Sequence, residues 1–307
     1  VNKFFLDTGV FPQTQAVLQN RAKPLGIELV FGNVIDYTFN DAYFGAIVQY
    51  PNAKGEIEEY TAIADQLHAQ NGSLVVAADL MSLSVIKEPG KFGADVVVGS
   101  TQRFGVPVGF GGPHAAYFAT KEDFKRNIPG RIIGVSKDTK GNPAFRMALQ
   151  TREQHIKREK ATSNICTAQA LLAVMASMYA VYHGPSGIKR IASDIAKRTK
   201  SLKTGLEQQN IEVVTQNFFD TIAIKVADKE QLKKKAEEAG INFFYTLDDV
   251  VLISLNETTK NVHVKAILEL FGKNNFTVSN ETGIQSNSVR TTPYLQHSIF
   301  NKYHSET

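Results

Sequence analysis

Short apolar runs alternate with amphipathic segments through the first 120 residues of the chain. The runs predict strands at residues 4–6, 27–31, 44–50, 73–78, 94–98 and 115–120. Between them, the sequence predicts a helix over residues 57–70 and a helix from Pro12, the latter with Ala16, Val17, Leu18 and Ala22 facing the core. The run at residues 44–50 is continuously apolar, which is typical of a parallel strand covered on both faces. The pattern therefore predicts a doubly wound α/β domain with a mainly parallel sheet.

The pattern of predicted helices and strands changes near residue 187 and predicts a second, smaller α/β domain. Before it, residues 131–143 predict a hairpin, and residues 167–182 predict a helix that buries Leu171, Leu172, Met175 and Met178. A helix over residues 188–209 then carries an apolar stripe through Ile191, Ile195, Leu202 and Leu206, which is typical of a helix that bridges two domains. The small domain is predicted from strands at residues 221–226 and 250–255 and helices at residues 229–239 and 262–271. We place the large domain at residues 1–190, and the bridging helix with the small domain at residues 191–307.

Polar side chains follow three successive predicted strands: Gln49, Asp79 and the segment Ser100–Arg103. Ligands of doubly wound sheets gather at the carboxyl ends of the strands, so these residues mark a candidate rim of a binding site. The alternative for each is a polar residue that only ends a strand. The segment GVPVGFGGPH at residues 105–114 follows the rim, but it matches neither a Walker A loop nor the pattern GxGxxG. It predicts a tight loop, since glycine permits positive φ.

The stretch at residues 152–167 places charges and hydroxyl groups directly before a predicted helix. The residues that carry this chemistry are Arg152, His155, Thr162, Ser163 and Asn164. Free backbone N–H groups and the helix dipole make such an N-terminus suited to a phosphate or a carboxylate. The alternative is an ordinary capped helix whose charged neighbours pair with one another in solvent.

Composition and residue spacing argue against several classes of function. The net charge is +4, and we find no nucleic-acid-binding module and no basic patch with interleaved aromatic residues. No apolar run approaches the roughly 18 residues that a membrane-spanning helix requires. One cysteine, Cys166, excludes an internal disulfide, and the seven histidines show no metal-ligand spacing. We expect no nucleic acid, membrane or metal partner, a buried Cys166, and a bacterial cytoplasmic rather than a mitochondrial location.

Three sequence blocks make the pattern specific: VVGSTQRFGVPVGFGGPHAAYFAT at residues 97–120, IPGRIIGVSKDTKGNPAFRMALQTREQHIKREKATSNICTAQALLA at residues 128–173, and FNKYHSET at residues 300–307. They closely resemble the amino-terminal half of glycine dehydrogenase (decarboxylating), the P-protein family of the glycine cleavage system, and the resemblance runs across essentially the whole chain. It implies a fold type I large domain, as in enzymes of pyridoxal 5′-phosphate (PLP), and a small C-terminal α/β domain. It also implies an intact enzyme that decarboxylates glycine and passes the aminomethyl group to the lipoyl arm of the carrier H-protein.

The resemblance further implies that this half is not itself catalytic. In the family, the carboxyl-terminal half is a diverged copy with a lysine just before its glycine-rich loop. The matching position here is Gln102, whose amide cannot bind the cofactor covalently. The aspartate that faces the cofactor ring in that copy matches Ala77, and Asp79 lies two residues further on. We therefore expect no catalytic residue in this half and no PLP on this chain alone.

By the same resemblance, this half docks against the PLP-bearing half and lends groups to the cofactor phosphate. The candidates are Thr162, Ser163 and Asn164, with Arg152 and His155 as electrostatic support. The alternative is a purely structural dimerisation scaffold without cofactor contact. Both fused and separate halves occur in the family, and the sequence does not decide between them. Family members have further sequence before Val1, so we expect an exposed sheet edge or pocket near residues 1–6.

Overall fold

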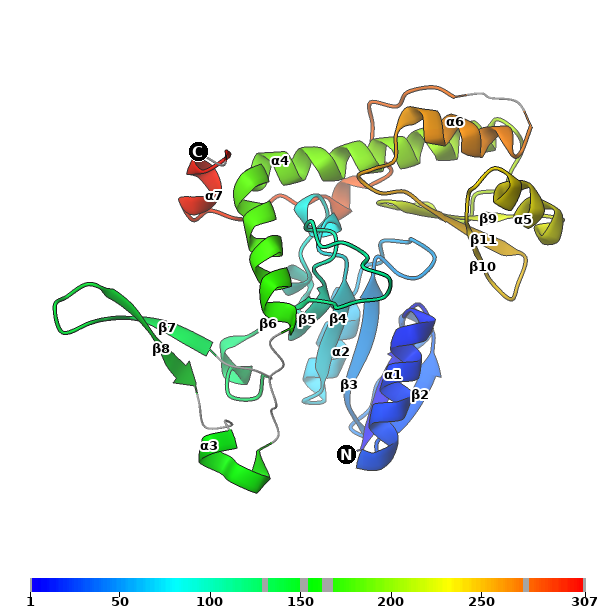
Figure 1. Cartoon of the computed structure of the whole chain (residues 1–307). Helices are drawn as coiled ribbons and strands as arrows, with labels where there is room; N and C mark the ends of the chain where they lie inside the picture. Colours follow the sequence, from blue (N-terminus) through cyan, green and yellow to red (C-terminus); the bar gives the residue numbers. More distant parts are fainter. Residues whose placement is uncertain (1, 129–131, 150–153, 162–167, 273–275, 306–307) are drawn as a thin grey trace.

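The computed structural model describes residues 2–128, 132–149, 154–161, 168–272 and 276–305 (Figure 1). Its largest sheet has six strands in the order β2-β1-β3-β4-β5-β6. These strands are β1 Lys3–Asp7, β2 Glu28–Gly32, β3 Tyr43–Tyr50, β4 Ser73–Ala78, β5 Val96–Ser100 and β6 Ala116–Thr120. The first five are parallel, and β6 is antiparallel to β5. The predicted mainly parallel α/β sheet is confirmed.

Strand β1 lies inside the sheet, between β2 and β3. Its residues Phe5 and Leu6 are fully buried. The expectation of an exposed edge near residues 1–6 is therefore wrong, and the edges are β2 and β6. The apolar run of β1 suits an interior position covered on both faces, whereas β2 exposes Glu28 and Phe31.

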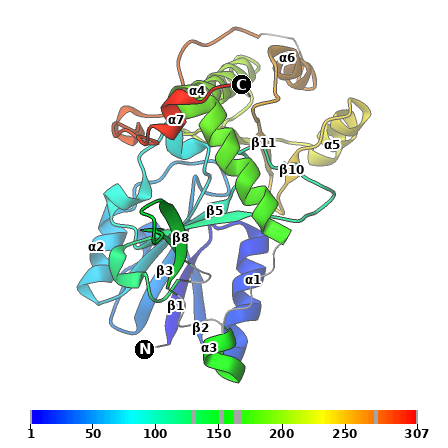
Figure 2. The ribbon, with the colours of Figure 1, turned by 60° about the vertical axis from the view of Figure 1, so that its left-hand side comes forward.

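Helices cover both faces of this sheet (Figure 2). On one face, alternate residues of β3 and β4 pack with α2 Thr61–Ala69 and with the long helix α4 Ala168–Glu207. On the other face, Leu6 and Ile47 pack with Leu18 of α1 Pro12–Ala22. The predicted doubly wound arrangement is thereby confirmed, since successive strand residues point to opposite faces.

Two details of these helices differ from the prediction. Within α1, Ala16 and Val17 are exposed, because the helix meets the sheet along the line of Leu18 and Ala22, one turn apart. Helix α2 begins at Thr61 instead of residue 57. The N–H of Ile57 donates to the carbonyl of Asn217, and its carbonyl accepts from the Asn217 side chain, each at 2.8 Å. The carbonyl that would accept the first helical hydrogen bond is therefore already used in a tertiary contact.

The hairpin of β7 Ile132–Lys137 and β8 Pro143–Leu149 confirms the predicted turn, but its second strand continues past the predicted end at residue 143. The hairpin extends away from the sheet (Figure 1). Asp138 closes its turn by accepting hydrogen bonds from the N–H groups of Lys140 and Asn142, each at 2.8 Å. The short helix α3 Gln154–Lys157 follows. Single-turn 3₁₀ helices occur elsewhere: η1 Lys23–Leu25, η2 Val34–Asp36, η3 Ser82–Ser84, η4 Pro89–Phe92, η5 Glu122–Phe124, η6 Arg158–Lys160 and η7 Ser286–Ser288.

Helix α4 Ala168–Glu207 joins the two predicted helices through a kink. At the kink, Gly184 has φ 62° and ψ 177°, and Pro185 supplies no N–H. Before the kink, Leu172 and Ala176 are buried, whereas Leu171 is 67% and Met178 56% exposed. The predicted burial of those two residues is wrong, because the face toward the sheet follows residues 172, 176 and 180. After the kink, the predicted stripe is confirmed, with Ile195, Leu202 and Leu206 fully buried and Ile191 packed against the core.

The small unit is an antiparallel sheet in the order β10-β11-β9 with two helices. Its elements are β9 Thr221–Lys225, α5 Lys229–Glu238, β10 Phe244–Tyr245, β11 Val250–Ser254 and α6 Asn261–Glu269. They pack around the second half of α4 through Leu202 and Leu206. The predicted strands and helices are confirmed within a few residues; β10, with two residues, is too short to give a sequence signal.

After the small unit, the chain returns to the large sheet (Figure 1). Val289 pairs with Ile86, and the hydroxyl of Tyr294 donates to the carbonyl of Pro185 at 2.7 Å. The short helix α7 Ile299–Lys302 then lies beside α4. Residues beyond 190 thus complete the packing around the first sheet, and the division at residue 190 stays a prediction. Among the helices in the described ranges, none is long and apolar enough to cross a membrane.

Candidate functional site

The carboxyl ends of β3, β4 and β5 lie level with one another, as predicted. Gln49 pairs with Ala77, and Ala77 pairs with Val98. Asp79 directly follows β4 and Ser100 ends β5, so both lie at the same rim of the sheet. This is the rim at which doubly wound folds bind their ligands.

The turn after β4 fixes the carboxylate of Asp79. The Asp79 N–H donates to the carbonyl of Tyr50 at 3.0 Å, which continues the ladder of the sheet by one residue. The N–H of Ser82 donates to Asp79 Oδ1 at 2.7 Å, and the Ser82 hydroxyl donates to the Asp79 carbonyl at 2.8 Å. The second carboxylate oxygen, Oδ2, is left to face a cation.

That cation is Arg103, which links the rim to the small unit. Its Nη1 lies 3.3 Å from Asp79 Oδ2 and also donates to the carboxylate of Asp220, the residue before β9. Its Nη2 lies 3.8 Å from Glu257, and its guanidinium carbon lies 5.5 Å from the ring centroid of Phe219. The Arg103 side chain is only 20% exposed. One guanidinium therefore faces three carboxylates, which we call the Arg103 cluster.

The charges of the Arg103 cluster depend on one another. Burial raises the pKa of Asp79, Arg103 opposes that rise, and the neighbouring Asp220 adds to it, with a net increase. Burial alone would lower the pKa of Arg103, but Asp79, Asp220 and Glu257 raise it above its ordinary value. The guanidinium is thus permanently charged and cannot act as a nucleophile or a base.

Gln102 and Ala77 are placed without a catalytic contact. The Gln102 N–H donates to Ser100 Oγ at 3.1 Å, and its carbonyl accepts from the N–H of Val106 at 3.1 Å, so its backbone forms the turn after β5. Ala77 lies within β4 and packs partly buried on the α1 side of the sheet. Neither position presents an amine or a carboxylate to the rim.

The residues predicted to contact a phosphate mostly lie outside the described ranges. Arg152, Thr162, Ser163 and Asn164 are all in this group, and Cys166, which was predicted to be buried, also lies outside the described ranges. His155 belongs to α3, and its side chain is outside the description as well. The roles predicted for these residues stay predictions.

The glycine-rich loop at residues 105–114 is anchored at both ends and exposed between them. Val106 and Ala115 pack against Leu172 and Ala176 of α4, whereas Phe110 is fully exposed. Four of its glycines have positive φ, including +100° at Gly111. The conformation agrees with the tight loop that the sequence predicts.

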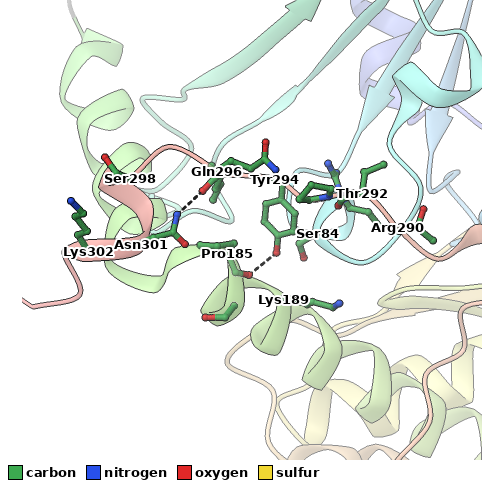
Figure 3. A pocket seen from close by; sticks show the side chains of 14 residues that line it. Ser84, Pro185, Lys189, Arg290, Thr292, Tyr294, Gln296, Ser298, Asn301 and Lys302 are labelled. Carbon is green, nitrogen blue, oxygen red and sulfur yellow. Dashed lines mark hydrogen bonds between the residues drawn. The ribbon is translucent and has the colours of Figure 1, made fainter.

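A concavity with a volume of about 880 Å³ lies between the kink of α4 and the C-terminal segment (Figure 3). Arg290 lines this concavity. Its guanidinium donates to the carbonyls of Leu83 at 2.7 Å and Thr292 at 3.0 Å and lies 4.9 Å from the Tyr294 ring centroid. These contacts hold the C-terminal segment in place. In the described part of the chain, no group of three or more His, Cys, Asp or Glu side chains could hold a metal ion.

The sequence predicts Asp79 and Arg103 as rim residues, but neither their pairing nor the contributions of Asp220 and Glu257. The available signal was weak: Asp220 immediately precedes a predicted strand, and Glu257 follows one by two residues. Nothing in the linear sequence indicates that the small unit faces the ends of β4 and β5.

Comparison with known proteins gives consistent matches. The family model described as "Glycine cleavage system P-protein" matches residues 1–271. Glycine dehydrogenase (decarboxylating) from Christiangramia forsetii is 50% identical over 314 residues, which cover 100% of this chain and 33% of the relative. The protein of that name from a Nostoc species is 50% identical over 320 residues with the same coverage. The chain thus spans about a third of the length of these curated relatives.

Solved structures agree with this result. A crystal structure of glycine decarboxylase (P-protein) of the glycine cleavage system, in inhibitor-bound form, has a TM-score of 0.80 and 31% identity over 88% of this chain and 65% of that chain. A C-DES mutant with glycine covalently linked to its PLP cofactor gives 0.61 at 15% identity, covering 90% of this chain and 75% of that one. An aspartate aminotransferase from Thermus thermophilus gives 0.60 at 13%, covering 88% and 76%. The last two show the fold alone, and the fold type I prediction is confirmed.

Proposed function

Since the chain belongs to the glycine cleavage system P-protein family, we propose that the protein containing it is the PLP-dependent glycine dehydrogenase (decarboxylating) of that system. In this proposal the intact protein releases CO₂ from glycine and transfers the aminomethyl group to the lipoyl arm of the H-protein. The chain itself is a non-catalytic half that supports the PLP-bearing half. The bacterial origin of the two relatives supports a bacterial cytoplasmic location.

The Arg103 cluster is the observation that carries the non-catalytic role. Covalent attachment of PLP requires an amine, and PLP supplies the electron sink for decarboxylation when it is bound. At the ends of β4 and β5, the cation among the described residues is instead the guanidinium of Arg103, which pairs with Asp79 and Asp220. These residues do not fit covalent PLP attachment. In this proposal, no catalytic step takes place on this half.

The supporting role falls to the segment before α4. We propose that Thr162, Ser163 and Asn164 donate hydrogen bonds to the phosphate of PLP in the partner half, and that Arg152 and His155 add positive charge behind them. The free N–H groups and the dipole of a long helix favour an anion at this end. Helix α4, which is described from Ala168 onward, supplies such a helix.

A reconstitution experiment tests this role. The chain would be mixed with the PLP-bearing half of the Christiangramia forsetii enzyme, and glycine decarboxylation and PLP affinity would be measured. Thr162→Ala with Asn164→Ala should weaken PLP binding by at least about tenfold, because charge-assisted hydrogen bonds to the phosphate are lost. Association of the two halves should persist. Unchanged PLP affinity and activity would instead support the alternative, a dimerisation scaffold without cofactor contact.

A spectrum of the chain alone tests the non-catalytic assignment separately. PLP added to the purified chain should leave no protein-bound absorbance band after dialysis, because Gln102 and Arg103 cannot form the covalent link. An absorbance band that survives dialysis would contradict the assignment if chemical reduction of the protein removes the band and leaves the cofactor fixed to an identifiable lysine.

A further inference from the structure

The β7–β8 hairpin exposes an apolar face to solvent. The register pairs Ile133 with Met147 and Val135 with Phe145, so these four side chains share one face. Ile133 is 55% exposed, Val135 80% and Phe145 77%. The opposite face pairs Gly134 with Arg146 and Ser136 with Ala144. The hairpin is therefore amphipathic, with its apolar side uncovered.

The hairpin has no support from the rest of the described chain on this face. Neither strand contains a buried residue, and the hairpin extends away from the six-stranded sheet (Figure 1). An isolated two-stranded hairpin is marginally stable at best in water, because it has no core against which to bury its apolar side. Such a hairpin gains stability when a partner covers Val135 and Phe145.

A second apolar surface lies on the first half of α4. Leu171 is 67% exposed, Val174 55% and Met178 56%, and their spacing of three and four residues places them along one stripe. Leu172 and Ala176, on another face of the helix, are buried. The hairpin precedes residues 150–167 and this stripe follows them. Exposed apolar surfaces thus flank the segment proposed to contact the cofactor phosphate.

Charge distinguishes the possible occupants of the hairpin face. The charged residues of the hairpin are Lys137, Asp138, Lys140 and Arg146. Three cations against one carboxylate disfavour a second copy of this chain, whose hairpin would carry the same charge. A partner with acidic side chains around an apolar patch fits better.

The length of the relatives indicates which partner covers the hairpin. The chain covers 33% of the Christiangramia forsetii enzyme, so most of a P-protein lies outside it. We propose that the apolar face of the β7–β8 hairpin docks on the PLP-bearing half, at an apolar patch bordered by acidic side chains. This inference rests on the proposed function, since it names the surface through which the two halves associate.

Association of the chain with the PLP-bearing half of the Christiangramia forsetii enzyme, measured by analytical ultracentrifugation, tests the surface. Val135→Ser with Phe145→Ser should raise the dissociation constant by at least about tenfold, since buried aromatic anchors dominate interface energies. The matched control is Phe244→Ser with Val262→Ser on the small unit, where the wild-type side chains are 54% and 62% exposed. It should change affinity by no more than about twofold.

Each other outcome has a distinct meaning. Equal affinity of the hairpin variant and the wild type would overturn the inference while leaving the test with Thr162 and Asn164 valid. Failure of the wild-type chain to bind the PLP-bearing half would overturn the proposed function and this inference with it. A homodimer of the chain alone that Phe145→Ser dissociates would overturn the choice of partner. Affinity that does not fall as salt is raised would contradict the acidic border.

Hydrogen exchange provides a second readout that a folding defect does not mimic. The amides of residues 132–137 and 144–149 should exchange rapidly in the free chain and slowly in the complex. Circular dichroism should be the same for the variant and the wild type, because the substituted side chains are exposed. Unchanged exchange of these amides in a formed complex would overturn the inference.

Discussion

At the scale of single residues, Arg103 is the side chain on which the rim of the large sheet depends. Arg103→Ala would leave Asp79 and Asp220 facing each other in a partly buried site without a counter-charge. Removing one partner of a buried ion pair destabilises a protein by about 3 kcal/mol. We expect that loss in the free energy of unfolding, measured with urea by circular dichroism.

Arg103→Lys serves as the control for charge alone. Lysine retains the positive charge but lacks the planar fork with which Nη1 and Nη2 reach separate carboxylates, so it should recover only part of the stability. Equal stability of the wild type and Arg103→Ala would show that the cluster contributes nothing to the fold.

Asp95 gives a pH-dependent prediction. Burial would raise the pKa of Asp95, but hydrogen bonds from Lys121, His68 and the N–H of Leu74 outweigh it and hold the pKa below its ordinary value. Because the pKa is lower in the folded than in the unfolded chain, the stabilisation is complete at neutral pH. It is lost as the pH falls through the folded-state value.

Asp95→Asn should therefore be less stable than the wild type by about 2 kcal/mol at pH 7, and the difference should shrink as the pH falls below about 4. Thermal unfolding across this pH range measures it. Asp65→Asn, an exposed position on α2, is the control and should follow the wild type. A difference that stays constant with pH would contradict the role of the ionised carboxylate.

At the scale of elements, the kink of α4 depends on Gly184. Its φ of +62° is unfavourable for other residues, and a Cβ there would lie 2.7 Å from the carbonyl oxygen of Phe300 and 2.8 Å from His304 Cε1. Gly184→Ala should lower the stability by about 2 kcal/mol. It should also make α7 more susceptible to limited proteolysis, because α7 packs at the kink.

The neighbouring exposed Ser186 provides the control for this prediction. Ser186→Ala keeps the helix and leaves the contact with Phe300 unchanged, so proteolysis of the C-terminal segment should match the wild type. Equal protection of α7 in Gly184→Ala would mean that the segment docks independently of the kink.

The elements themselves were largely predictable, whereas their buried faces were not. The runs that form β3 and β4 are apolar on both faces, and such a run has few alternatives to a covered strand. Helix α4 is different, because Leu171 and Leu172 are both apolar and only tertiary packing selects residue 172. The Arg103 cluster was missed for the same reason, since residues 79, 103, 220 and 257 meet only in three dimensions.

At the scale of the whole molecule, Asn217 joins three segments that are distant in sequence. Its buried side chain donates to the carbonyl of Ile57 at 2.8 Å and to the hydroxyl of Ser288 at 2.9 Å, and it accepts from the N–H of Gln285 at 2.9 Å. It therefore connects the large sheet, the small unit and the returning C-terminal segment.

Asn217→Ala should destabilise the protein by about 2 kcal/mol, because it leaves buried backbone groups without partners. Calorimetry should also show the unfolding transition broadening or dividing into two, since the contact links separately packed cores. Asn256→Ala, in an exposed turn of the small unit, is the control. A single sharp transition of unchanged midpoint would show that other contacts couple the units.

The return of the C-terminal segment also affects how this chain is made. Ile284, Leu295 and Phe300 pack against the core that Phe5 and Ala46 help to form. A ribosome releases these residues in order, so the sheet lacks part of its covering until residues 284–300 have left the exit tunnel. During that interval the nascent chain exposes apolar surface, the condition that chaperones recognise and that favours misassembly.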